Sequence, residues 1–339
     1  MMSNSLVITK DTKVLVGCPA NIATGGPELL HQLVYELTKL GFDAYMYYYS
    51  RVEGINPVNT VYTLYKNKFV DYIEDTPNNI LIMPETKTGL LYNYHNIQKI
   101  IWWLSVDNHF NFLNAQSILK KYIKLFLYKL NYYPRYSIYR FNRQDNIIHF
   151  VQSEYANQML KSRGIRESFF LGDYLNKLFI EQQAQYLETK KENIVLYNPK
   201  KGVVFTKKLI TKAKKIQFIA IENMSREEVS KLLSKAKVYI DFGNHPGKDR
   251  IPREAAISNC CVITGMQGSA KYYKDVAIDD EFKFNDTEED LQLIINKIID
   301  CFENYKLNKK KFAFYRNKIN KEQNEFISDI RKIFIKNYE

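Results

Sequence analysis

Metal-binding patterns are missing from this sequence. Its 339 residues contain four cysteines, none in a CxxC pair and none near a histidine at zinc-finger spacing. No DxD element follows a predicted strand, and the acidic cluster at 279–281 is better interpreted as a turn. We therefore expect reduced thiols, no metal site and chemistry that does not depend on a metal ion.

Long hydrophobic runs are also absent. No stretch of about 18 apolar residues occurs, and residues 1–13 lack the basic, apolar and small-residue order of a signal peptide. The sequence therefore predicts a cytoplasmic protein that does not span a membrane.

Positive charge and aromatic residues are abundant by contrast. Lys and Arg number 49 against 37 Asp and Glu, a formal net charge of +12, and there are 26 Tyr and 20 Phe. Such a charge favours an anionic partner, which composition alone leaves open between a nucleotide, a nucleic acid and an acidic membrane surface. The chain length suits about two domains of roughly 150 residues each.

Short apolar runs alternate with amphipathic stretches along the chain. This alternation predicts parallel, doubly wound sheets, first over residues 13–152 and again from residue 193. A polar stretch at 175–191 is interpreted as a linker. The expected domains are an N-terminal Rossmann-like domain at 1–175, a C-terminal one at 192–305, and a basic helical segment at 306–339 that packs back on the first domain. In such folds ligands bind at the carboxyl ends of the strands, so we expect a central cleft between the two sheets.

Gly25 and Gly26 follow the first predicted strand and precede a helix. Glycines at this place let a backbone approach an anion or a sugar, and the N–H groups of the helix start attract negative charge. An ordinary tight turn, with Pro27 at the first helical position, explains the same residues. The pair is a candidate acceptor or phosphate loop.

A second loop, at 241–254, holds a high density of functional side chains between a predicted strand and a predicted helix. Its cations beside a helix start suit a diphosphate, and Glu254, expected in the first helical turn, could accept both hydroxyls of a ribose. Glu254 could instead serve only the helix dipole. The candidate donor-binding residues here are Gly243, His245, Gly247, Lys248, Arg250, Arg253 and Glu254.

The residues from Pro252 to Thr264 resemble the "LEAMACGxPVI" donor segment of GT-B glycosyltransferases, especially family 4. Val151 to Tyr155 is similar to the family's "xxSEY" junction, and Pro199 to Gly202 to its "KG" turn. The resemblance covers about residues 13–275. It implies two Rossmann-like domains, a nucleotide-sugar donor as co-substrate and no further cofactor.

The resemblance also implies residue roles. Glu254 matches the second Glu of the family's Glu-x7-Glu pattern, which holds the nucleotide ribose, and Lys201 matches the lysine that binds the diphosphate. Pro246 stands where the first Glu belongs, which leaves the donor sugar and the stereochemistry open. The family's arginine is absent as well, and Lys200, Lys248 or Arg250 could supply its charge. His245-Pro246 is similar to the "HP" element of transferases that use CMP-sugars.

Asp107 and His109 follow the apolar run at 100–106, which predicts that they lie at a strand end. Either could deprotonate an acceptor hydroxyl, or the histidine could help to bind the donor sugar. The simpler alternative is that Asp107 caps a turn and that the His109 imidazole forms a local hydrogen bond. Glu85, after the preceding strand, is a lesser candidate for the same role.

The segment 108–144 contains no acidic residue and interleaves cations with aromatics. Leu119, Ile123, Phe126 and Leu130 share one helical face, which suits a helix at an anionic membrane surface. Plain packing of this face on the sheet and binding of single-stranded nucleic acid are the alternatives, although no nucleic-acid signature is present.

The sequence thus predicts a cytoplasmic, peripherally membrane-associated GT-B enzyme that transfers a sugar to a glycan or lipid-linked acceptor in bacterial-type surface polysaccharide synthesis. No nucleic-acid partner is expected. A non-catalytic GT-B-like scaffold and a CMP-sugar transferase remain alternatives.

Overall fold

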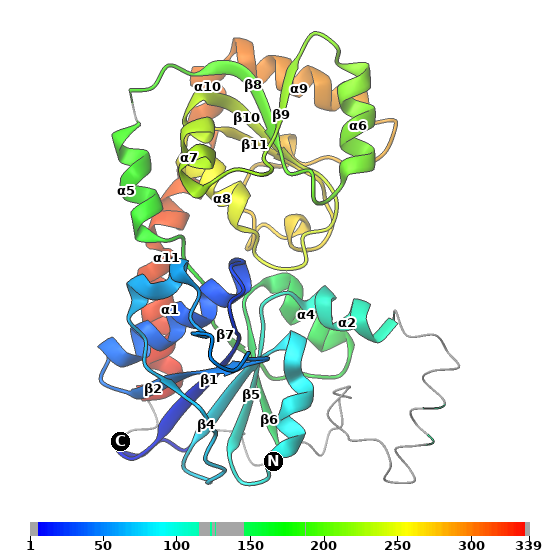
Figure 1. Ribbon diagram of the computed structural model, residues 1–339. Coiled ribbons are helices and arrows are strands. Elements are labelled where there is room, and N and C mark those ends of the chain that lie inside the picture. The colour runs from blue at the N-terminus through cyan, green and yellow to red at the C-terminus, as the bar shows by residue number, and fades with distance from the viewer. Residues whose placement is uncertain (1–5, 115–122, 124–125, 127–145, 187, 336–339) are drawn as a thin grey trace. The chain divides into compact units, whose positions relative to one another are not determined.

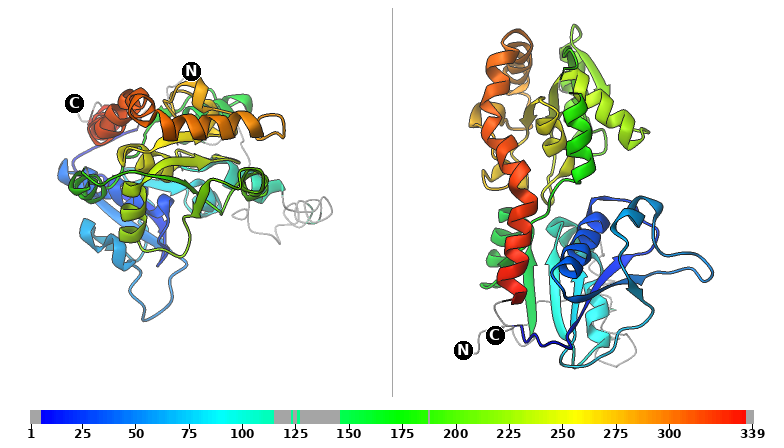
Figure 2. Two further views of the ribbon diagram at one scale, coloured as in Figure 1. Left: turned by 90° about the horizontal axis from the view of Figure 1, so that it is seen from above. Right: turned by 90° about the vertical axis from the view of Figure 1, so that its left-hand side faces the viewer.

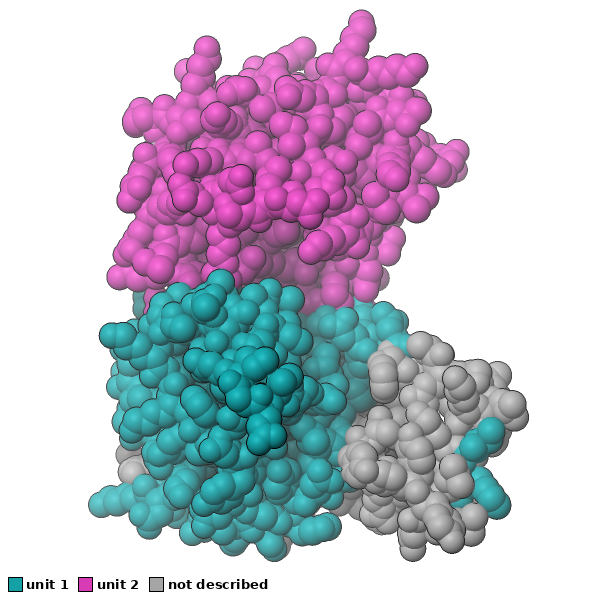
Figure 3. Space-filling model, viewed as in Figure 1, with its two compact units in different colours: residues 1–152, 156–173, 324–339 teal, residues 153–155, 174–323 magenta. Residues whose placement is uncertain are grey.

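The computed structural model describes residues 6–114, 123, 126, 146–186 and 188–335, and it forms two compact units (Figure 3). Unit 1 comprises residues 1–152, 156–173 and 324–339, and unit 2 comprises residues 153–155 and 174–323. Each unit contains one sheet of parallel strands (Figure 1). No helix in the described ranges is long and apolar enough to cross a membrane.

Unit 1 is built on seven strands in the order β3-β2-β1-β4-β5-β6-β7. The inner strands β4 and β6 are buried along their whole length, because helices and turns exclude water from both faces of a parallel sheet. The elements of unit 1 up to its last strand are β1 (Lys13–Pro19), α1 (Gly25–Lys39), β2 (Asp43–Tyr49), η1 (Thr60–Tyr65), β3 (Phe69–Val70), β4 (Ile80–Pro84), η2 (Glu85–Asn93), β5 (Gln98–Trp103), α2 (Val106–Asn114), β6 (Ile147–Val151), α4 (Glu154–Ser162) and β7 (Phe169–Phe170).

Unit 2 is built on four parallel strands in the order β11-β10-β8-β9. Figure 2 shows α9 and α10 on one face of this sheet and α5 and α7 on the other, and a single apolar core joins the layers. The elements that follow β7 are α5 (Lys177–Gln185), β8 (Glu192–Tyr197), α6 (Val203–Lys212), β9 (Gln217–Ala220), α7 (Arg226–Lys235), β10 (Ala236–Asp241), α8 (Arg250–Ile257), β11 (Cys261–Thr264), η4 (Ser269–Lys271), η5 (Asp280–Phe282), α9 (Leu291–Glu303), α10 (Tyr305–Lys311) and α11 (Ala313–Ile330).

Two predicted segments differ from the structure. The expected linker at 175–191 contains helix α5, whose buried Gln183 donates from Nε2 to the backbone oxygen of Ser230 at 3.2 Å. The expected strand at 100–106 ends at Trp103, and α2 begins at Val106. Asp107 and His109 therefore lie in the first turn of a helix and not at a strand end.

The last residues of α11 belong to unit 1, although the helix begins in unit 2. The Phe326 ring stacks with the Trp102 ring at 6.3 Å between centroids, and both side chains are almost fully buried. Phe334 adds edge contacts to Phe42 and Phe150. The C-terminal aromatics thus complete the core of unit 1.

This contact predicts a measurable loss of stability. Phe326→Ala should lower the free energy of unfolding of unit 1 by about 3–5 kcal/mol, because it opens a cavity against Trp102. Both tryptophans of the chain, Trp102 and Trp103, lie in unit 1, so their fluorescence during urea unfolding reports on this unit. Phe314→Ala, which changes an exposed aromatic of the same helix, is the control and should cost far less. Equal losses in the two variants would contradict the packing argument.

Candidate functional site

Three loops meet at one edge of the unit 2 sheet. They follow β8, β10 and β11 and span residues 198–202, 242–249 and 265–268. Because all strands are parallel, their carboxyl ends lie at the same edge, which is where such sheets bind ligands.

The first two loops touch through glycine backbone. Gly202 and Gly243 have left-handed φ angles of 57° and 94°. A Cβ atom on Gly202 would lie 2.0 Å from the carbonyl oxygen of Phe242, and one on Gly243 would lie 2.5 Å from the nitrogen of Gly202. No side chain fits between the loops, so both positions require glycine.

The third loop packs against the second in the same way. Gly268 has a φ of 62°, and a Cβ atom on it would lie 2.1 Å from the carbonyl oxygen of His245. The Ser269 hydroxyl donates to the carbonyl of Gly247 at 2.6 Å, and the Ser269 backbone donates to that of His245 at 2.8 Å. The 242–249 loop is therefore held on both sides by main chain.

A buried ionic network lies beneath these loops. The Lys201 ammonium contacts the carboxylate of Asp249 and lies 3.2 Å from Oδ1 of Asp241, and His245 Nδ1 lies 2.8 Å from Oδ2 of Asp249. Burial lowers the pKa values of Lys201 and His245, but the two carboxylates outweigh it and raise both. Burial raises the pKa of Asp249, but the neighbouring cations prevail and hold it at about 2. The contacts therefore favour the protonated forms of Lys201 and His245 and the ionised form of Asp249.

The same residues could hold a cation. One ligand atom each from Asp241, His245 and Asp249 lies within 4.8 Å of the others, and two carboxylates with an imidazole suit a divalent metal. The ammonium of Lys201 contacts both carboxylates in this structure, so the cluster already contains a positive charge.

Arg253 and Lys248 both pair with a carboxylate on α11. Glu322 of α11 accepts from Arg253 Nη1 at 2.7 Å and lies 2.7 Å from Lys248 Nζ. The Arg253 side chain is 1% exposed, and its other nitrogens donate to the carbonyls of Asp249 and Lys248. These two cations therefore anchor the 242–249 loop to α11.

Glu254 and Arg250 form a pair on α8. Arg250 Nε lies 3.0 Å from Glu254 Oε1, and the arginine side chain is 36% exposed. The helix begins at Arg250, two residues before the expected start, so Glu254 lies beyond the first turn. Lys200 is exposed, and its backbone N–H donates to Asn198 Oδ1. The His245 side chain is fully buried.

Four acidic residues of this edge were not predicted. Asp241 and Asp249 lie at the two ends of the predicted donor loop. Their position next to its cations in the sequence could have identified them as partners of those cations. Asp286 accepts from Gly243 N–H at 2.7 Å and from Gln267 Nε2 at 3.0 Å, and burial raises its pKa. Glu322 is 69 residues from Arg253, and no local pattern in the sequence connects them.

In unit 1, Glu85 organises the residues after β5. Its carboxylate accepts from the Leu104 N–H at 3.0 Å, and the Ser105 N–H and the Asn108 side chain also bond to it. Burial raises its pKa to about 7 although these bonds lower it. The carboxylate thus holds the turn that starts α2 and carries Asp107 and His109.

His109 is bonded to the same residue. Its Nδ1 lies 3.0 Å from the carbonyl oxygen of Glu85 and must carry the proton of that bond. Burial lowers the pKa of His109, which favours the neutral imidazole with its lone pair on Nε2. The ring packs edge-on against Trp103 and Phe110. Asp107 is also buried.

Gly25 and Gly26 open α1 in unit 1. A Cβ atom on Gly25 would meet nothing within 4 Å, and one on Gly26 would lie 3.8 Å from Leu104. The preceding Thr24 is fixed by Tyr62, whose hydroxyl donates to its carbonyl at 2.7 Å. The loop is therefore fixed by Tyr62, and there is open space beside Gly25.

Most of the basic aromatic segment 108–144 lies outside the described residues. Ile123 and Phe126 of the predicted amphipathic face are described, and both are exposed. Leu119 and Leu130 are not among the described residues.

No protein-family model matches this chain. Over 98 residues it is 34% identical to an alpha-1,6-glucosyltransferase of Actinobacillus pleuropneumoniae serotype 7, covering 28% of this chain and 29% of that protein. The match therefore spans less than a third of the length of that curated relative.

Solved structures match along almost the whole chain. HepE of Anabaena in complex with UDP-glucose has a TM-score of 0.57 and 11% identity, and covers 95% of this chain and 98% of its own. T4 phage BGT in complex with UDP and Mn²⁺ has a TM-score of 0.54 and 13% identity, with 95% and 99% covered. WaaG, a glycosyltransferase involved in lipopolysaccharide biosynthesis, has a TM-score of 0.53 and 12% identity, with 94% and 99% covered. These likenesses confirm the predicted GT-B fold.

The glycine contact at this edge is testable. Gly202→Ala should lower the free energy of unfolding by about 1–3 kcal/mol, because the methyl group would meet the Phe242 carbonyl and the φ angle is left-handed. Gly172→Ala is the control, since a Cβ atom there would meet nothing within 4 Å. Differential scanning calorimetry measures both. A stable Gly202→Ala variant would mean that the two loops are further apart than described.

The Glu85 carboxyl predicts a pH dependence. Its folded pKa of about 7 is above the ordinary value of 4.5, so the folded chain keeps a proton that the unfolded chain has lost. Below the unfolded-state pKa of 4.5 this group makes its full contribution to the free energy of unfolding. That contribution is lost as the pH rises through the folded-state pKa of about 7. Between about pH 5 and pH 8, the free energy of unfolding of the wild type should fall by up to roughly 3 kcal/mol relative to that of Glu85→Gln. Urea unfolding followed by tryptophan fluorescence measures both. The exposed Glu53→Gln should follow wild type, and parallel curves for wild type and Glu85→Gln would refute the assignment.

Proposed function

We propose that this chain, which has the GT-B fold, is a glycosyltransferase that moves a sugar from a nucleotide-sugar donor to a glycan or lipid-linked acceptor in bacterial-type surface polysaccharide synthesis. The observation that carries the proposal is the carboxyl edge of the unit 2 sheet, where three glycine loops, Arg250 and Glu254 come together. Full-length likeness to GT-B structures that hold UDP or UDP-glucose supports it.

The donor nucleotide binds at this edge. Glu254 accepts hydrogen bonds from the ribose hydroxyls, and Arg250, which already pairs with Glu254 at 3.0 Å, lies close to the diphosphate. Exposed Lys200 adds a second cation. A uridine nucleotide is the first candidate, since the solved neighbours carry one and the curated relative is an alpha-1,6-glucosyltransferase.

The transfer does not need a metal ion. A departing nucleoside diphosphate carries negative charge, which fixed cations and helix N–H groups stabilise at little reorganisation cost. Lys201 provides one such charge, and its contacts with Asp241 and Asp249 supply the positive charge that a divalent ion would otherwise bring to that cluster.

The acceptor binds to unit 1. The open glycines at 25–26 admit a sugar, and neutral His109 or Asp107 accepts the proton of the attacking hydroxyl in an inverting reaction. Glu85 fixes the turn that carries both residues. The basic aromatic segment 108–144 binds an anionic membrane surface, which places the enzyme at the inner face of the cell membrane.

One observation favours a second candidate. Pro246 replaces the first Glu of the family pattern, and a chain that has lost a sugar contact could bind nucleotides or glycans without turnover. Such a scaffold would bind a nucleotide and hydrolyse no donor.

A nucleotide panel tests the proposal. UDP, GDP, dTDP and CMP are titrated by calorimetry, and the sugar donors of any binder are tested for turnover with and without EDTA. We expect one nucleotide to bind and its donor to turn over in EDTA. Glu254→Ala should weaken that binding by about tenfold or more, because a charge-assisted bond to the ribose is lost.

Glu303→Ala is the matched control, since this exposed carboxylate lies at the end of α9. It should bind as wild type does. Nucleotide binding and transfer that survive Glu254→Ala would refute the donor site. Binding without turnover of any donor would favour the scaffold.

A further inference from the structure

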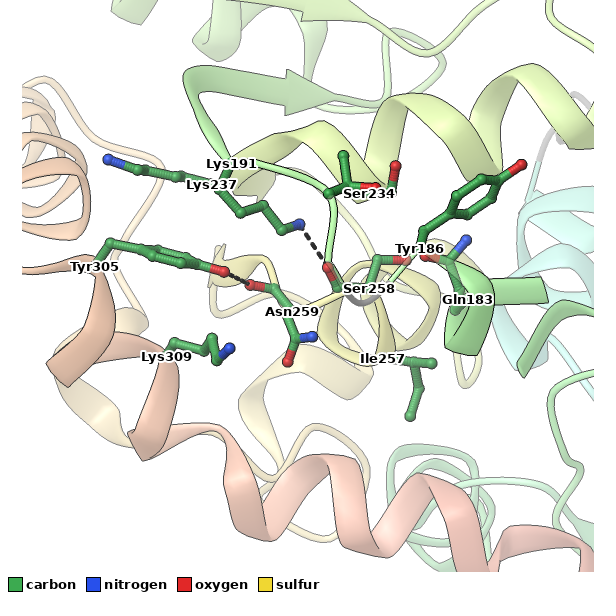
Figure 4. A pocket seen from close by; sticks show the side chains of 11 residues that line it. Gln183, Tyr186, Lys191, Ser234, Lys237, Ile257, Ser258, Asn259, Tyr305 and Lys309 are labelled. Carbon is green, nitrogen blue, oxygen red and sulfur yellow. Dashed lines mark hydrogen bonds between the residues drawn. The ribbon is translucent and has the colours of Figure 1, made fainter. Parts of the chain in front are cut away.

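A cavity of ≈270 Å³ lies at the opposite edge of the unit 2 sheet, where β8 and β10 begin (Figure 4). Its wall comes from the ends of α5, α7 and α8, the starts of the two strands, and α10. The loops at 198–202 and 242–249, which form the proposed nucleotide site, follow the carboxyl ends of the same strands. The cavity is therefore separate from the proposed donor site.

Three lysines line this cavity, and none of its eleven lining residues is acidic. Lys191, Lys237 and Lys309 contribute the positive charges. Within the described ranges none of these three has a carboxylate at ion-pair distance, whereas Lys201, Lys248 and Arg253 at the other edge all do.

Lys191 has a partly buried ammonium that is bonded only to neutral groups. It donates to the carbonyls of Leu233 and Ala236 at 2.9 Å and to that of Ser258 at 2.5 Å (Figure 4 draws the last bond). The three carbonyls match the three donors of a protonated amine and lie where α7 and α8 end, and Cys260 Sγ adds a contact at 3.9 Å. These dipoles hold the cation without cancelling its charge.

The other two lysines lie against one aromatic ring. The Nζ atoms of Lys237 and Lys309 are 5.6 and 6.0 Å from the Tyr305 ring centroid. Lys237 donates to Asn193 Oδ1 at 2.7 Å and to the Phe302 carbonyl at 2.8 Å, both neutral. Burial lowers the pKa of Lys191, Cys260 and Cys261 raise it, and the charge of Lys309 lowers it, so Lys191 and Lys309 repel each other.

We propose that this cavity binds a small phosphomonoester, either inorganic phosphate or a sugar phosphate. A doubly charged phosphate relieves the repulsion between Lys191 and Lys309. Asn259 and the hydroxyl groups of Ser258 and Tyr305 supply polar contacts for the rest of the ligand. The volume is near the lower limit of about 300 Å³ for pockets that enclose drug-sized ligands, which favours a sugar phosphate over a nucleotide-sugar.

Helix α8 connects this cavity to the proposed donor site. It begins with Arg250 in the nucleotide loop, and the residues at its end, Ile257 to Asn259, line the cavity. A ligand at the cavity therefore contacts the same helix that carries Glu254.

Calorimetry on the full chain tests the proposal, with saturating UDP present to block the diphosphate site. Inorganic phosphate, glucose 6-phosphate and neutral glucose are the three probes. At least one phosphate probe should bind, and glucose should not. Tighter binding of glucose 6-phosphate would identify a sugar phosphate, and equal binding would identify the phosphate group alone as the ligand.

Lys309→Gln should weaken phosphate binding by about tenfold, since it removes one cation without touching the bonds of Lys191. Lys310→Gln is the matched control, because it removes the same charge from an exposed neighbour that does not line the cavity. Absence of phosphate binding, or equal weakening in both variants, would overturn the proposal. Both results are independent of whether the chain transfers a sugar, which UDP binding and donor turnover report separately.

Discussion

The arrangement of the proposed nucleotide site depends on backbone contact between the loops at 198–202 and 242–249. This site lies at the carboxyl edge of the unit 2 sheet, called here the nucleotide edge. Gly202 and the Phe242–Gly243 peptide approach so closely that a methyl group has no room. This contact brings Lys201 over the end of β10, within reach of Asp241 and Asp249. His245 then pairs with Asp249, and Gly268 packs on the His245 carbonyl. The ionic network and all three loops thus depend on the absence of side chains at Gly202, Gly243 and Gly268.

The two edges of this sheet treat buried positive charge differently. At the nucleotide edge Lys201, Lys248 and Arg253 each have a carboxylate partner, so the loops that these residues anchor are fixed before a ligand arrives. At the opposite edge the ammonium of Lys191 is bonded to carbonyls at helix ends and to the Cys260 sulfur, and it has no carboxylate partner among the described residues. Preorganisation is typical of a site that stabilises a leaving group, whereas uncompensated charge favours capture of an anion.

The fold and the loops of the site were predictable from sequence for a physical reason. Strands buried on both faces read as continuous apolar runs, and the loops that follow them hold the glycines and polar residues. The start of α2 was not predictable, because the Glu85 carboxylate that ends the strand region at Trp103 is 19 residues from the Leu104 N–H it binds. The sequence made Arg253 a candidate for binding the donor. No pattern in the sequence indicates that Arg253 is hydrogen-bonded to Glu322, 69 residues away. Local pattern thus located the loops, while long-range ion pairs decided which side chains reach the surface.

Helix α11 contributes to two separate cores. Glu322 belongs to unit 2, where it neutralises a fully buried arginine, and Phe326, one turn later, belongs to unit 1. A fragment that ends before Glu322 would remove the carboxylate partner of buried Arg253, which costs about 3–5 kcal/mol in comparable cases. A fragment that ends at Asp173 would lack the ring that covers Trp102. Neither unit is a contiguous piece of the chain, so ribosomal synthesis must pass Glu322 before the unit 2 core is complete and Phe326 before the unit 1 core is complete.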